Sequence, residues 1–213
     1  MKRLIAGFAL SVLSVAAQAY EFTFVGQVTQ TNGSLQGVSV GTVFEGRFSG
    51  SSPEENYFYI DPTIGIYGIA SYWFVTGQVT ANIGGHTIHA GAPEVTVYNN
   101  LGGDAEDGIQ LLGGYPIDID GMRHVNGSFG FNLATRTGNM GVIQELRLPD
   151  QIDAAAFDAP SSVSYGSLQH DGATVLEFAV RSISVVPEPT SSGMLAVGAL
   201  LVTALRRRRE QPA

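Results

Sequence analysis

The side chains best suited to chemistry in this chain are carboxylates that gather in two short stretches. The two groups are Asp104, Glu106 and Asp107 in a glycine-rich segment, and Asp118 with Asp120. Ca²⁺ takes six to eight oxygen ligands, so bunched carboxylates can collect it. The spacing matches no standard calcium loop, and solvated acidic turns are the simpler interpretation. The sequence therefore predicts no cofactor, with a Ca²⁺ site at these residues as the alternative.

The four histidines do not form a metal motif in the sequence. His86 and His89 are three residues apart, which on a strand places them on opposite faces and prevents joint binding of one ion, whereas a turn would allow it. His124 and His170 are isolated in the sequence and are expected to be surface or rim residues.

The sequence also lacks the signature of a hydrolase. There is no cysteine, which removes thiol catalysis and thiolate metal sites. There is no Gly-x-Ser-x-Gly elbow behind an apolar strand. A glycosidase needs two facing carboxylates, and with 17 acidic residues in 20–186 a chance pair carries no weight. We therefore predict that the chain is not an enzyme.

Aromatic residues offer a second kind of chemistry, because flat rings stack on sugars. The candidates for such a glycan-binding face are Tyr57, Tyr59, Tyr67, Tyr72, Trp73 and Tyr98. Alternation along strands buries about half of a strand's side chains, and Trp73 is expected in the core rather than at a site.

Alternating apolar and polar residues indicate that these side chains are positioned by strands. Strands are predicted within 21–29, with a bulge at Gly26, and within 39–48, 71–83, 87–90, 94–98, 108–112, 128–134, 142–148 and 173–186. The ranges 49–56 and 99–108 are expected to be loops, and only 151–157 is predicted to be helical, with Asp150 as its N-cap. Many short strands with glycine-rich turns predict an all-β domain over 20–186, an antiparallel β-sandwich of jelly-roll or Ig-like type.

The predicted domain is strongly acidic. Residues 20–186 contain five arginines, no lysine and 17 acidic residues, a difference of −12. The other basic residues of the chain lie in the two end segments. A phosphate backbone is repelled by such a domain, so nucleic acid is excluded as a partner, whereas cations and neutral polymers are not.

The N-terminus has the pattern of a secretion signal. Met1-Lys2-Arg3 is followed by an apolar run over 4–17 and by Ala17-Gln18-Ala19, a small-x-small cleavage site. Residues 1–19 are therefore predicted to be a signal peptide with a helical apolar region, cleaved after Ala19.

The C-terminal segment 187–213 has the pattern of a short membrane segment. Residues 190–205 carry no charge, and their 16 residues span roughly 24 Å as a helix. A hydrocarbon core is roughly 30 Å thick, so this single membrane helix is a marginal span, better suited to a temporary tether than to a lasting anchor. The four arginines Arg206, Arg207, Arg208 and Arg209 are expected on the cytoplasmic side, which puts the domain across the membrane.

Pro187-Glu188-Pro189, the apolar run and the arginine cluster together resemble the sorting signal of the PEP-CTERM family. Its members are exported proteins of Gram-negative bacteria that make extracellular polysaccharide. The resemblance implies recognition and removal of 187–213 by an exosortase, a membrane protease-transpeptidase. A looser similarity to β-rich members of this family covers 22–28, 41–48 and Leu148-Pro149.

These observations predict a non-enzymatic protein that crosses the inner membrane, is tethered by 190–205 and then reaches the cell surface or an extracellular matrix. The expected partners are the exosortase-type protease and extracellular polysaccharide. The alternative is a carbohydrate-binding or Ca²⁺-dependent adhesive module, and a secreted hydrolase comes third.

Overall fold

The computed structural model describes residues 19–59, 68–101, 106–135, 142–143, 145–149, 151–157 and 164–186. Residues 19–186 form one compact unit. Its strands are β1 (Ala19–Thr31), β2 (Val43–Tyr59), β3 (Gly68–Ile83), β4 (His86–Leu101), β5 (Glu106–Ile119), β6 (Met122–His124), β7 (Gly127–Ala134), β8 (Tyr165–His170) and β9 (Ala173–Val186). A 3₁₀ helix covers Ala154–Phe157.

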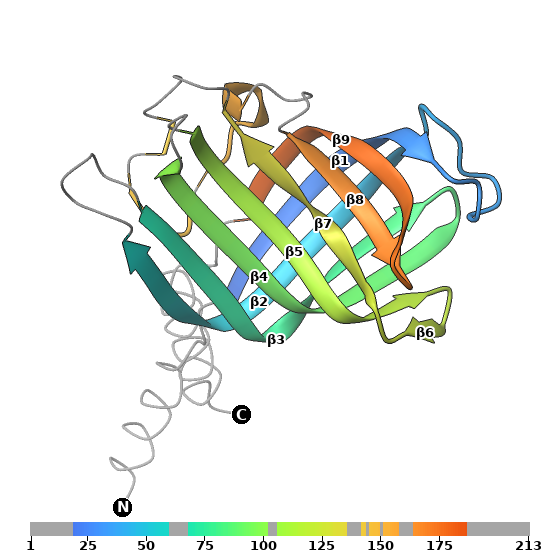
Figure 1. Ribbon diagram of the computed structural model, residues 1–213, viewed down its shortest axis with the longest axis horizontal. Coiled ribbons are helices and arrows are strands. Elements are labelled where there is room, and N and C mark those ends of the chain that lie inside the picture. The colour runs from blue at the N-terminus through green and yellow to red at the C-terminus, as the bar shows by residue number, and fades with distance from the viewer. Residues whose placement is uncertain are drawn as a thin grey trace, which may run out of the picture. The chain divides into compact units, whose positions relative to one another are not determined.

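The fold is all-β and its sheet is antiparallel, as predicted, but the sheet closes into a barrel (Figure 1). Its strand order is β4-β3-β2-β1-β9-β8-β7-β5, and β4 also pairs with β5. The ring therefore has eight strands, with the short β6 paired to β5 beyond it. The prediction of a sandwich was wrong. Each of these eight strands has a paired strand on both sides, whereas the edge strands of a sandwich have one on only one side.

Long, bent strands make this closure possible. The predicted loop 49–56 instead belongs to β2, which pairs with β3 as far as Tyr59. The predicted strands 87–90 and 94–98 are parts of one strand, β4. Gly91-Ala92-Pro93 between them is a bulge, with register shifts against β5 on both sides and Ala92 at φ 43°. The predicted bulge at Gly26 was wrong in its position. The register shift between Val25 and Gly26 leaves Arg181 of β9 without a partner on β1, and the extra residue of β1 itself is Thr29. Bulges of this kind bend strands and increase twist, which a closed sheet requires.

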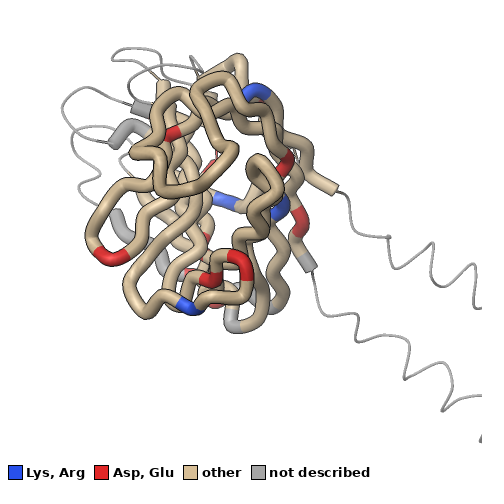
Figure 2. The backbone as a smooth tube through the Cα atoms, turned by 90° about the vertical axis from the view of Figure 1, so that its right-hand side faces the viewer, with Lys and Arg blue, Asp and Glu red and all other residues tan. Residues whose placement is uncertain are grey.

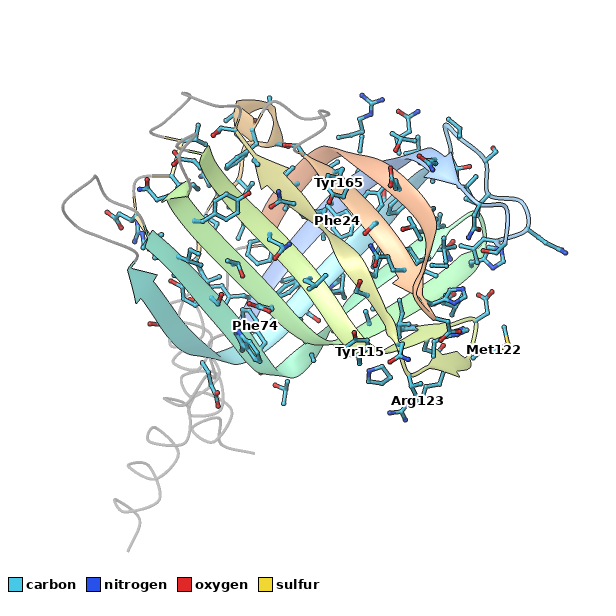
Figure 3. The ribbon with its side chains drawn as sticks, viewed as in Figure 1. Phe24, Phe74, Tyr115, Met122, Arg123 and Tyr165 are labelled. Atoms are coloured by element: carbon cyan, nitrogen blue, oxygen red, sulfur yellow. The ribbon has the colours of Figure 1, made fainter. Side chains whose placement is uncertain are left out.

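The barrel interior is filled by aromatic side chains. Phe24, labelled in Figure 3, is 2% exposed, and its ring lies 4.9 Å from that of Phe131 and stacks on that of Phe178 at 6.2 Å. Inward residues alternate with outward ones along β1 and β2, as the sequence pattern predicts. The register sets Phe24 opposite Gly46, and Gly26 opposite Phe44, so each ring lies over a glycine of the neighbouring strand.

A segment without strand structure lies against the barrel near the ends of β3, β4 and β5. The predicted strand 142–148 is wrong in its described part, because this segment is bonded to the barrel through side chains instead of a ladder. Tyr72 donates to the carbonyl of Leu146 at 2.8 Å, and Asn99 donates to that of Ile143 at 2.9 Å. Ile143 and Leu148 are buried.

The two end segments, 1–18 and 187–213, lie outside the described residues, together with the signal and sorting features expected there. Ala19, at the predicted cleavage site, is the first residue of β1 and pairs with Ser51, so β1 begins beside that site. In the described ranges, no helix has both the length and the hydropathy needed to cross a membrane.

Candidate functional site

One end of the barrel carries three tight two-residue turns, at the right in Figure 1. Gly84-Gly85 joins β3 to β4, Asp120-Gly121 joins β5 to β6, and Asp171-Gly172 joins β8 to β9. All six turn residues have positive φ, the type I′ geometry that matches the twist of hairpins. Each aspartate is therefore the first residue of a turn, and its side chain is close to a histidine of a neighbouring segment.

His124, His170 and Asp171 form the group with the most chemical potential at this end. His124 ends β6, His170 ends β8, and the Asp171 amide donates to the carbonyl of Asn126 at 2.7 Å. Backbone pairing thus brings together residues that are 47 positions apart. In the described part of the chain, this is the one group of three or more His, Asp or Glu whose ligand atoms all lie close together, within 4.8 Å of one another.

The cluster converges on one carboxylate oxygen. Asp171 Oδ2 lies 3.3 Å from Nδ1 of His124 and 3.4 Å from Nδ1 of His170. The two imidazole rings lie 4.5 Å apart, centroid to centroid, with 30° between their planes. The imidazoles are half-buried and the carboxylate is exposed, so the group is accessible from solvent.

A second histidine–aspartate pair at the same end is an ion pair. His86 Nδ1 lies 2.6 Å from Asp120 Oδ2, and His86 Nε2 donates to the carbonyl of Gln36 at 2.8 Å. Both partners are acceptors, so the ring satisfies them when it carries two protons. The hydrogen bonds to Asp120 and Gln36 therefore raise the pKa of His86 above its usual value. The hydrogen bond from His86, with that from Thr87, lowers the pKa of Asp120.

The carboxylates singled out in the sequence whose side chains the structure describes accept backbone hydrogen bonds. Asp107 is fully buried, and its Oδ2 accepts from the Ile143 amide at 2.9 Å. Asp118 accepts from the Gly121 amide at 2.7 Å, within the β5–β6 turn. Asp104 lies outside the described residues, as does the side chain of Glu106. Among the described carboxylates, the structure does not gather the predicted Ca²⁺ ligands into one site.

Other predicted residues divide between core and surface. His86 and His89 lie on opposite faces of β4, as expected: His89 is exposed, whereas His86 is half-buried. Tyr72 and Tyr98 are buried, but Trp73 is 57% exposed, so its placement in the core was wrong. The side chains of Tyr57, Tyr59 and Tyr67 lie outside the described residues.

The outer face of β1–β4 and β9 carries a shallow polar groove of about 840 Å³. Hydroxyl and amide side chains line most of it, including Gln78, Thr80 and Asn82. Arg47, also in its lining, pairs with Glu21 at 2.5 Å. Figure 2 shows acidic positions at several places on the barrel and few basic ones.

The described part of the chain is thus a closed eight-stranded antiparallel barrel that carries a histidine–aspartate cluster at one end. No family model, curated protein or solved structure matches the chain.

The sequence analysis missed the cluster because its members are far apart in the chain. The available signal was Asp171-Gly172 directly after His170, since Asp-Gly between alternating stretches predicts a two-residue hairpin. That signal places Asp171 beside His170. It does not place His124, whose position depends on the pairing of β6 with β5 and on the closure of the barrel.

Proposed function

We propose that the barrel is an exported, non-enzymatic domain that reaches the cell surface or an extracellular polysaccharide matrix after processing of its C-terminal segment. The observation that carries this proposal is the order of Pro187-Glu188-Pro189, the uncharged run 190–205 and the arginines 206–209. This order resembles the PEP-CTERM signal, so the processing enzyme we propose is an exosortase-type membrane protease.

The physical properties of the segment support a transient tether. An uncharged run of 16 residues crosses a bilayer only when the bilayer thins or the flanking arginines extend toward the interface. The arginines hold their end in the cytoplasm, which directs the barrel to the opposite side. Cleavage near Glu188 would release the domain from this marginal span and leave β9, which ends at Val186, intact.

The barrel itself supports a non-enzymatic role. Its interior is occupied by phenylalanine rings, and in an eight-stranded barrel packed side chains take the space that could otherwise hold a small ligand. Three of the candidate acids, Asp107, Asp118 and Asp120, accept backbone hydrogen bonds that hold turns or segments in place.

Intact-mass spectrometry of the surface form from the native host tests the proposal. We expect a mature chain that begins at Tyr20 and lacks Arg206–Arg209. In Glu188→Ala the arginines should remain, whereas the control Glu177→Ala, on β9, should be processed normally. Arginines 206–209 retained on the unaltered surface form would overturn the processing proposal.

A carbohydrate-binding role is the second candidate, and the polar groove favours it. Its amides and hydroxyls can exchange hydrogen bonds with sugar hydroxyls, and the groove lies on one open face of the barrel, where an extended neutral polymer has access. The net charge of 20–186 does not oppose a neutral ligand.

A glycan array with the full chain tests this candidate. Binding should be lost in the double substitution Gln78→Ala with Asn82→Ala, and kept in Gln169→Ala, an exposed amide on β8 outside the groove. Binding that survives the double substitution would exclude the groove as the glycan site.

A further inference from the structure

We propose that His124, His170 and Asp171 bind a divalent first-row transition-metal ion, represented by Zn²⁺, at the end of the barrel. The ligands are one imidazole nitrogen from each histidine and the Asp171 carboxylate. Water or a ligand from a partner completes the coordination. Imidazole and carboxylate together suit zinc and its neighbours in the first transition row, whereas Ca²⁺ and Mg²⁺ require oxygen ligands.

The spacing of the ligand atoms carries this proposal. Two ligand atoms each about 2.0 Å from a tetrahedral zinc lie about 3.3 Å from each other. Asp171 Oδ2 is 3.3 Å from His124 Nδ1 and 3.4 Å from His170 Nδ1. All three ligand atoms lie within 4.8 Å of one another, so a change in the orientation of the imidazole rings that brings their nitrogens closer together would place the three groups around one ion.

Both contacts of Asp171 are long hydrogen bonds, at 3.3 Å to His124 and 3.4 Å to His170. N–H···O bonds cluster at about 2.9–3.0 Å, and charge-assisted ones are shorter. The His86–Asp120 pair, at 2.6 Å, shows how close these two residue types come in this barrel when they form an ion pair. The longer separations around Asp171 leave space between the three groups that a metal ion would fill.

Electrostatics favour a cation at this position. Two neutral imidazoles and one carboxylate give a site of charge −1, which a divalent ion reverses. The two imidazole rings lie side by side, 4.5 Å apart from centroid to centroid, so both can present a nitrogen to the same ion. The surrounding domain is acidic and contains no lysine, which raises the local concentration of cations.

The backbone holds the site open toward solvent. His170 and Asp171 are fixed by the type I′ turn, and the Asp171 amide is bonded to Asn126, next to β6. His124 is carried by β6, which pairs with β5 at Ile117–Ile119. A bound ion would join β6 to the β8–β9 turn and restrain the short strand.

Calorimetric titration of the full chain with ZnCl₂ near neutral pH tests the proposal. We expect one ion per chain at this site, no comparable binding of Ca²⁺ or Mg²⁺, and slower amide exchange in β6 on zinc addition. Imidazole ¹⁵N resonances of His124 and His170 should shift together on zinc binding, which a structural role alone would not produce.

Asp171→Asn is the most informative variant, because asparagine also favours positive φ and keeps the turn while removing the charge. Asp171→Asn and His124→Gln should each weaken zinc binding at least about tenfold, by analogy with the 10–100-fold losses from weaker perturbations of metal sites. His89→Gln, an exposed histidine on β4, is the matched control and should bind normally. Absence of binding to the unaltered chain, or unchanged binding in Asp171→Asn and His124→Gln, would overturn the proposal.

Discussion

Replacement of Gly46 by alanine tests whether the close approach of Phe24 to β2 is a requirement of the barrel. Gly46 lies on the inner face of β2, opposite Phe24 on β1. An added Cβ would lie 2.2 Å from Cζ of the Phe24 ring, whereas ordinary contact begins at 3.4 Å. The ring must therefore move by about 1.2 Å. Its own neighbours, which are the rings of Phe44, Phe129, Phe131 and Phe178, oppose this movement.

Two effects of opposite sign determine the expected magnitude. Overpacking a well-filled core costs about 1–3 kcal/mol. Removing a glycine from a strand gains about 0.5–1 kcal/mol, because alanine loses less conformational entropy on folding. We expect Gly46→Ala to lower the free energy of unfolding by about 1–2 kcal/mol, a large share of the roughly 5–15 kcal/mol typical of a domain.

Urea denaturation followed by circular dichroism measures this difference. Gly114→Ala is the matched control, since Gly114 is on β5 and has no atom within 4 Å of an added Cβ. The control should be neutral or stabilised. Adding Phe24→Leu to Gly46→Ala should restore part of the loss, so that the two changes are non-additive. Equal stability of Gly46→Ala and Gly114→Ala would refute the reasoning.

Three further predictions concern named side chains outside the proposed zinc site. The pKa of His86 is raised in the folded state, so its contribution to stability is complete below about pH 6.5 and is lost as the pH rises through the folded pKa. The pKa of Asp120 is lowered, so its contribution is complete above about pH 3.8 and is lost as the pH falls through the folded pKa. The stability difference between the unaltered chain and Asp120→Asn, measured by denaturation, should therefore be greatest near pH 5 and smaller at pH 9. Asp107→Ala should cost about 1–3 kcal/mol, because it leaves the buried Ile143 amide without this acceptor, and amide exchange at Ile143 should accelerate. Trp73 is the one tryptophan of the chain and is 57% exposed, so its emission maximum should shift little on unfolding; a large red shift would contradict this exposure.

The strands were predictable because their alternation is a local property. Phe22, Phe24 and Val28 on β1, and Phe44 with Phe48 on β2, point inward as the pattern predicts. Closure was not predictable in the same way. A sandwich and a barrel bury the same alternate residues, and they differ in whether β4 also pairs with β5, which depends on bulges and long-range register.

The candidate site shows the same division between local and long-range information. Sequence spacing correctly placed His86 and His89 on opposite faces of a strand, because that depends on strand geometry alone. The proximity of the acids in sequence did not indicate their partners. Asp118 accepts from Gly121 within its own turn, Asp120 from Thr87 on β4, and Asp107 from the buried amide of Ile143. The exposure of Trp73 depends on which face of β3 is inward, which a run of four apolar residues does not specify.

The two histidine–aspartate arrangements show why residue type alone does not decide function here. Asp120 and Asp171 are both the first residue of an Asp-Gly turn, and both face a histidine. Asp120 meets one ring whose second nitrogen already donates to a carbonyl, and the outcome is a short ion pair. Asp171 lies almost equally far from two rings and makes a long hydrogen bond to each. In the first arrangement, a His86 ring that carries two protons donates to both of its acceptors. In the second, the metal ion that we propose would contact the Asp171 carboxylate and both imidazoles at once.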